Sequence, residues 1–194
     1  FTWDRPTHFN FANDVVDKWA QQNPSKQALF WVDDNGNEKT RTFDQISRNS
    51  KKISNALTDS GVKRGDVIVL LLGREVEWWE AFTAALRMGA VVSPGTTQLS
   101  AKDIEYRLGA ASATCIVTNA ANAEKVDEVA ASCPTLATKV LVDGLCDGWL
   151  HYPTLLDKSA EDFTEINTAS NDESMCYFTS GTTGYPKMTI HTQD

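Results

Sequence analysis

Basic residues are few in this sequence, and its apolar runs are short. Its 18 Lys and Arg are outnumbered by 26 Asp and Glu, giving a net charge of −8. Nucleic-acid binding requires positive groups that neutralise phosphates, and anionic membrane surfaces attract polybasic segments. The longest apolar run, Val67 to Leu72, is too short to span a bilayer. We therefore expect no nucleic-acid partner and no membrane span.

Cysteine and histidine are also scarce. The four cysteines are irregularly spaced and form no C-x-x-C pair: Cys115, Cys133, Cys146 and Cys176. We interpret them as reduced, structural thiols, which are typical of an intracellular protein. The three histidines are too scattered for a metal-ligand set: His8, His151 and His191. With no paired carboxylates in an apolar context, the sequence predicts neither a catalytic acid–base couple nor a metal site in this chain.

The residues that are present suffice for a packed domain. Hydrophobic residues make up 41% of the chain and charged residues 23%, which is the balance of a globular protein. A length of 194 residues normally corresponds to one domain.

Strand and helix patterns alternate along most of the chain. Asn10 is a candidate cap for a helix that ends at Asn23-Pro24, and a β-hairpin follows over 28–33 and 38–43. Thr42 and Gln45 form a capping box for a helix that Gly61 closes. Buried strands are predicted at 67–72, 90–93, 114–118 and 139–142, alternating with helices at 75–88, 100–108 and 120–131. This order predicts an α/β fold with a mainly parallel sheet flanked by helices.

Three parts are expected along the chain. An α/β subdomain covers about 1–143, a weakly patterned connection covers 144–174 with a possible helix near 152–159, and a strand pair covers 175–194. The chain starts at Phe1 and ends at Asp194, close to the second strand of this pair. We therefore expect an incomplete amino-terminal domain of a longer protein, without its carboxyl-terminal domain.

The strongest chemical signal lies in nine residues near the end: Thr179, Ser180, Gly181, Thr182, Thr183, Gly184, Tyr185, Pro186 and Lys187. The glycines allow positive φ and close approach to a ligand. Backbone amides, hydroxyl groups and an ammonium group together suit phosphate. This is not a Walker A loop, because the lysine does not follow a glycine and residues 187–192 alternate like a strand rather than opening a helix. The pattern predicts a polyphosphate-binding loop between two strands.

Four other features have weaker functional interpretations. Residues 64–66 spell Arg-Gly-Asp, but a turn is favoured, and core packing is favoured over base stacking for Trp78 and Trp79. Residues 94–97 follow a parallel strand at the edge where α/β sheets bind ligands, although a plain turn is the better interpretation. His191 could line the ligand cleft, but a structural role is favoured.

The loop from Thr179 to Lys187 resembles the T-S-G-[ST]-T-G-x-P-K signature of the adenylate-forming superfamily. Within it, the sequence is most similar to the medium-chain acyl-CoA synthetases, which also share Met188 after the lysine. This similarity extends over essentially the whole chain, through residues 9–17, 64–66, 77–79, 94–98, 103–108 and 146–150.

The resemblance implies an ATP-dependent ligase that uses Mg²⁺ with ATP and takes CoA as co-substrate. A medium-chain fatty acid would form an acyl-adenylate and pyrophosphate, and CoA would then displace AMP. Residues Thr179 to Lys187 would hold the β- and γ-phosphates. The adenine, ribose and magnesium sites and the mobile domain lie further along in relatives, so the chain alone is expected to be inactive. A mitochondrial matrix location is implied by relatives only, and the cytoplasm is possible.

Two alternatives remain open. The protein could adenylate another carboxylic acid, such as an aromatic one, or it could be a non-catalytic module that binds a nucleotide or a partner.

Overall fold

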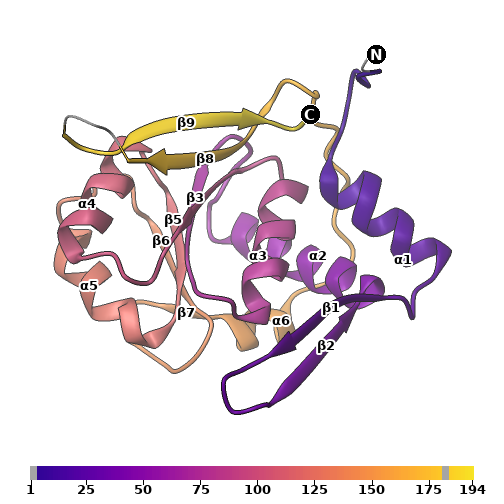
Figure 1. The fold of residues 1–194 in the computed structure, drawn as a ribbon, viewed down its shortest axis with the longest axis horizontal. Coiled ribbons are helices and arrows are strands. Elements are labelled where there is room, and N and C mark those ends of the chain that lie inside the picture. Colours follow the sequence, from indigo (N-terminus) through magenta and orange to yellow (C-terminus); the bar gives the residue numbers. More distant parts are fainter. Residues whose placement is uncertain (1–3, 181–183) are drawn as a thin grey trace.

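A seven-stranded sheet forms the centre of the computed structural model, which describes residues 4–180 and 184–194 (Figure 1). The strand order is β7-β6-β5-β3-β4-β8-β9. All neighbouring strands are parallel except β8 and β9, which are antiparallel. The bounds are β3 Val67–Leu71, β4 Val91–Gly95, β5 Cys115–Thr118, β6 Thr138–Leu141, β7 Leu150–His151, β8 Glu173–Thr179 and β9 Lys187–Thr192. The predicted mainly parallel α/β fold is confirmed.

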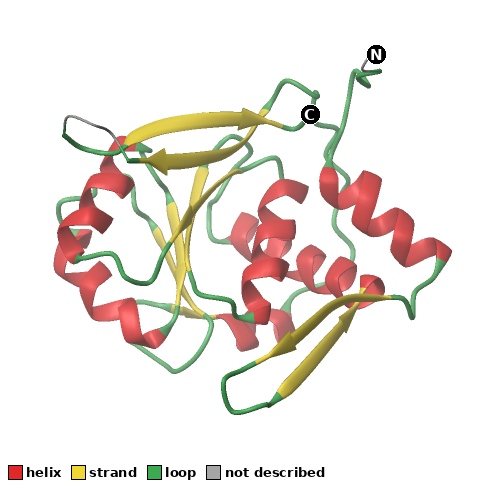
Figure 2. Cartoon of the chain, viewed as in Figure 1, coloured by secondary structure: helices red, strands yellow, loops and turns green. Residues whose placement is uncertain are grey.

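Helices cover both faces of this sheet (Figure 2). One face carries α2 (Phe43–Asp59), α3 (Val76–Arg87) and α6 (Tyr152–Lys158), and the other carries α4 (Ala101–Ala110) and α5 (Ala120–Ala130). Successive residues of β3 alternate between the two layers, as a strand buried on both faces requires. Ile68 and Leu70 pack in the α2 and α3 layer, whereas Val69 and Leu71 pack in the α4 and α5 layer.

A separate two-stranded hairpin precedes the sheet, as predicted. Strands β1 (Gln27–Val32) and β2 (Glu38–Thr42) pair antiparallel. The predicted capping box then begins α2, because the Thr42 hydroxyl accepts the Gln45 amide at 3.2 Å and the Gln45 side chain accepts the Thr42 amide at 2.9 Å. Gly61, with φ of +95°, follows the end of α2.

The first helix differs from the expected single α-helix. It begins with a π-helical segment, η1 (Ala12–Asp17), and continues as α1 (Lys18–Gln22). Asn10 caps it as predicted, since its side-chain oxygen accepts the amides of Ala12 at 3.1 Å and Asn13 at 3.4 Å.

Strand β4 extends further than the sequence indicated. Pro94 and Gly95 were expected to end the strand, but they pair with Leu70 and Leu71 of β3. The amide of Val91 donates to Asp66 on the β3 side, so by alternation the nitrogen of Pro94 faces β8. Strand β4 pairs with β8 at Val92, before Pro94 is reached, and the missing amide hydrogen is therefore tolerated.

The core prediction for the tryptophan pair holds for only one of them. The ring of Trp78 stacks on Phe82 with centroids 5.0 Å apart and packs against the core, but Trp79 is 46% exposed. Strand β7 was not predicted either, because a two-residue strand has no readable periodicity.

The four cysteines are free thiols. Cys115, Cys133 and Cys176 are buried, and burial, with a smaller effect of the Asp66 charge, raises the pKa of Cys115 to about 12. Cys146 is also a free thiol, but it is exposed rather than packed in the interior. Among the described residues, no helix combines the length and the apolarity needed to cross a membrane.

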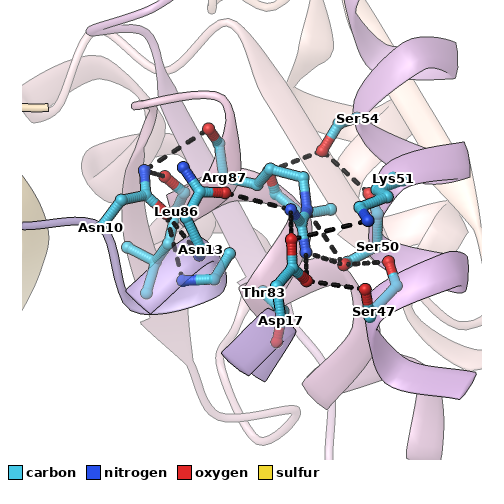
Figure 3. Close-up of polar contacts among 12 residues, drawn as sticks. Asn10, Asn13, Asp17, Ser47, Ser50, Lys51, Ser54, Thr83, Leu86 and Arg87 are labelled. Carbon is cyan, nitrogen blue, oxygen red and sulfur yellow. Dashed lines mark hydrogen bonds and ion pairs between the residues drawn. The ribbon is translucent and has the colours of Figure 1, made fainter. Parts of the chain in front are cut away.

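A buried ion pair joins the first helix to α3, one of the helices that cover the sheet (Figure 3). The Arg87 guanidinium donates to both carboxylate oxygens of Asp17, at 2.8 and 2.7 Å, and also to Ser50 and Asn13. Its side chain is only 2% exposed. Asn10 adds a second link by donating to the carbonyl of Leu86 at 2.8 Å. These contacts hold η1 against α2 and α3.

Candidate functional site

The predicted loop is the closed end of the β8–β9 hairpin, which lies beside α4 (Figure 1). Thr179 and Lys187 are cross-strand partners, and the Thr179 hydroxyl donates to the Lys187 carbonyl at 3.2 Å. This pair closes the neck of the loop. The prediction that residues 187–192 form a strand rather than a helix is confirmed.

Six of the nine predicted site residues are described, and they gather at this end of the hairpin. Thr179, Ser180 and Lys187 are exposed residues. Gly184 has φ of +129°, a conformation that favours glycine, as predicted. The remaining three lie outside the described residues: Gly181, Thr182 and Thr183.

The position of the loop in the sheet is one where α/β proteins bind ligands. Strand β8 runs parallel to β4, so its end at Thr179 lies at the same edge as the carboxyl ends of the other parallel strands. Ligands of open α/β sheets bind outside this edge.

Tyr106 of α4 contacts the loop and was not predicted as a site residue. Its hydroxyl donates to the carbonyl of Pro186 at 2.8 Å, and its ring stacks on Tyr185 with centroids 4.6 Å apart and an interplanar angle of 19°. The helical pattern gives little indication of this contact. Ile104 and Leu108 are the buried positions of the predicted helix, and Tyr106 falls outside their spacing.

Of residues 94–97, Pro94 and Gly95 complete β4, and the connection that follows them is held by internal contacts. Lys125 of α5 donates to the carbonyls of Thr97 and Leu99, each at 3.3 Å, and to the side chain of Asn122 at 3.0 Å. These contacts are those of an ordered strand-to-helix connection.

Two other weak candidates, residues 64–66 and His191, make contacts within the fold. Gly65 has φ of +82° in a turn, where the Asp66 carboxylate accepts the Lys63 amide at 2.9 Å. His191 lies on β9 and meets Tyr177 edge to face, with centroids 5.5 Å apart.

The donor set of the hairpin end suits an anion. It offers hydroxyl groups, main-chain groups and one ammonium group, which are the groups that bind phosphate oxygens. Within residues 4–180 and 184–194, no three His, Cys, Asp or Glu side chains gather as a metal-ligand set.

Comparison with known proteins gives consistent matches. The family described as AMP-binding enzyme matches residues 16–194. The chain is 42% identical over 194 residues to the human (Homo sapiens) protein "Acyl-coenzyme A synthetase ACSM3, mitochondrial", an alignment covering 96% of this chain and 33% of that protein. It is 43% identical over 195 residues to "Acyl-coenzyme A synthetase ACSM4, mitochondrial" of Rattus norvegicus, covering 97% of this chain and 34% of that protein. The chain thus spans about a third of the length of these curated relatives.

Solved structures share the fold. The Brucella canis acyl-CoA synthetase matches with a TM-score of 0.87 at 25% identity, over 100% of this chain and 35% of that chain. The anthranilate CoA ligase AuaEII, solved in complex with anthranoyl-AMP, matches with a TM-score of 0.85 at 23% identity, over 98% of this chain and 36% of that chain.

Proposed function

The chain belongs to the family of AMP-binding enzymes, and from this premise we propose that the protein containing it joins a carboxylic acid to CoA in two steps. The carboxylate attacks the α-phosphate of ATP, forming an acyl-adenylate and releasing pyrophosphate. The CoA thiol then attacks the acyl carbon, forming the thioester and releasing AMP. The relatives named as acyl-coenzyme A synthetases support this reaction.

The β8–β9 loop holds the β- and γ-phosphates in the first step. Negative charge moves onto the departing pyrophosphate, and donors that are already oriented stabilise it there. The carrying observation is that Thr179, Ser180 and Lys187 are all exposed at the closed hairpin end, where Thr179 and Lys187 are cross-strand partners. Gly181, Thr182 and Thr183 complete the loop in sequence and belong to the same proposal.

Mg²⁺ accompanies ATP in this proposal, but the described residues do not fit a magnesium site. Magnesium prefers carboxylate oxygens, water and substrate phosphates, whereas the described loop residues supply hydroxyls and an ammonium group. The phosphates and parts of the protein beyond this chain would supply its ligands.

A medium-chain fatty acid is the proposed acid, and the mitochondrion is the proposed location. The first rests on the similarity of segments throughout the chain to medium-chain synthetases, and the second on relatives named mitochondrial. An aromatic acid is the second candidate, since a structural neighbour is an anthranilate CoA ligase.

The test is ATP–pyrophosphate exchange by the full-length protein with octanoate, butyrate, benzoate and anthranilate. We expect the fastest exchange with octanoate. Faster exchange with an aromatic acid would favour the second candidate, and no exchange with any acid would contradict the ligase and favour a non-catalytic module.

Lys187→Ala in the full-length protein tests the loop itself. Losing a charged hydrogen bond to phosphate should slow exchange about 10- to 100-fold. Lys158→Ala, which removes an exposed lysine from α6 on the far layer, is the matched control and should leave the rate unchanged. An unchanged rate in Lys187→Ala would remove this lysine from the site.

A further inference from the structure

Helix α4 contacts the phosphate-loop hairpin on both sides of the loop. On the side leaving the loop, Tyr106 of α4 stacks on Tyr185 and donates its hydroxyl hydrogen to the Pro186 carbonyl at 2.8 Å. On the side entering the loop, Tyr106 meets Phe178 edge to face at 6.0 Å, and the Arg107 guanidinium lies 4.9 Å from the centre of the same ring. Contacts from α4 therefore flank the loop on both sides.

Helix α4 is itself fixed in place. Ser100 and Asp103 form a capping box at its start, and Ile104 and Leu108 are buried against the sheet at 2% and 0% exposure. Tyr106 projects from the remaining surface of an anchored helix, so its ring and hydroxyl act on the loop from a stable support.

The hydrogen bond to Pro186 constrains the main chain of Lys187. The Pro186 carbonyl and the Lys187 amide nitrogen belong to one planar peptide group. Fixing the carbonyl fixes that plane, and with it the direction in which the chain enters Lys187. Tyr185 is 62% exposed, so burial does little to hold it, whereas the ring of Tyr106 stacks on it directly.

We propose that Tyr106 is a positioning residue that sets the geometry of the phosphate loop for ATP. The inference rests on the proposed function, because it assigns the loop to ATP phosphates. Tyr106 touches the loop rather than the reacting atoms, and it acts through the Pro186–Lys187 peptide and the Tyr185 ring.

Tyr106→Phe in the full-length protein separates positioning from packing, because it keeps the ring and removes only the hydroxyl. We expect the KM for MgATP to rise about 3- to 10-fold, the range that corresponds to one net hydrogen bond. The KM values for octanoate and CoA should stay unchanged. Tyr185→Leu, which removes the stacking partner from the exposed side without touching the core, should raise the same KM.

Tyr152→Phe is the matched control. It also deletes one tyrosine hydroxyl, which donates to buried Glu80 at 3.1 Å on the other layer of the molecule. It should lower the melting temperature and leave the KM for MgATP unchanged. Hydrogen–deuterium exchange of the peptide spanning 179–188 gives a readout without catalysis, and Tyr106→Phe should accelerate exchange there whereas Tyr152→Phe should not.

The outcomes distinguish the two proposals. If the wild-type protein exchanges pyrophosphate but Tyr106→Phe has the wild-type KM for MgATP and wild-type loop exchange, the positioning role is wrong. Equal increases in all three KM values would also contradict it, since they indicate general destabilisation. A wild-type protein inactive with every acid refutes the proposed function, and positioning of the loop is then judged by hydrogen exchange alone.

Discussion

Two residues of α3 carry charge into the interior, and each is matched by partners from elsewhere in the chain. Arg87 meets Asp17, and Glu80 accepts hydrogen bonds from Arg41 and Asn49, both at 2.9 Å. Removing one partner of a buried pair leaves an uncompensated charge and costs about 3–5 kcal/mol. These pairs therefore make the packing of η1, α2 and α3 sensitive to single substitutions.

The Asp17–Arg87 pair should also give stability a dependence on acid. Burial alone would raise the pKa of Asp17, but the hydrogen bonds and charge of Arg87, with Ser47 and Lys51, outweigh it and hold that pKa below its usual 3.8. The stabilisation is therefore present above the unfolded-state value and is lost as pH falls through the folded-state pKa.

Asp17→Asn should lower the free energy of unfolding by about 3 kcal/mol at pH 7. The gap to wild type should begin to narrow below about pH 4, where the carboxyl of the unfolded state takes up a proton, and should close as pH falls through the lower folded-state pKa of Asp17. Urea denaturation between pH 7 and pH 3 measures this. Asp14→Asn, which breaks the more exposed pair with Lys18 one turn earlier, is the control and should cost under about 1 kcal/mol. A constant gap across this range would contradict the proposed linkage.

At the scale of elements, helix starts were the most predictable feature. The capping box at Thr42 has a clear sequence signature, and Ser100 forms a second one with Asp103. Each satisfies amide groups that the helix itself cannot.

The two caps should differ in their effect on the loop. Thr42→Ala and Ser100→Ala should each lower the free energy of unfolding by about 1 kcal/mol. Because α4 carries Tyr106, only Ser100→Ala should also speed hydrogen exchange in residues 184–188. Equal loop exchange in the two variants would show that α4 does not transmit the loss of its cap.

Other element boundaries depended on tertiary context that periodicity does not contain. By its propensity alone, Pro94 would end a strand. Strand β4 nevertheless continues through Pro94, because the Pro94 nitrogen faces β8 and β4 pairs with β8 only at Val92. Trp79 fits an apolar helical pattern, but its side chain stays 46% exposed in the folded chain. The π-helical form of η1 has no sequence signature among its six residues.

At the scale of the whole molecule, the hairpin was predictable from the sequence and its neighbours were not. The two β-prone runs predicted the strand–loop–strand unit that the structure has, and the hydroxyls, glycines and lysine between them predict a phosphate ligand, which stays a prediction. The contact between Tyr106 and Pro186 joins residues 80 positions apart. It exists because β8 inserts beside β4, a strand order that local patterns do not specify.

The same topology predicts how the 194-residue chain behaves alone. Its phosphate loop is supported by α4, while all six residues of β9 are exposed. Acyl-adenylate formation needs a site that excludes water, because water competes for the activated intermediate. We therefore expect the isolated chain to show no ATP–pyrophosphate exchange with butyrate or octanoate under conditions where the full-length protein is active. Circular dichroism should establish that the isolated chain is folded in the same assay, and exchange above the no-enzyme blank would show that this hairpin and its supporting helix suffice for the first step.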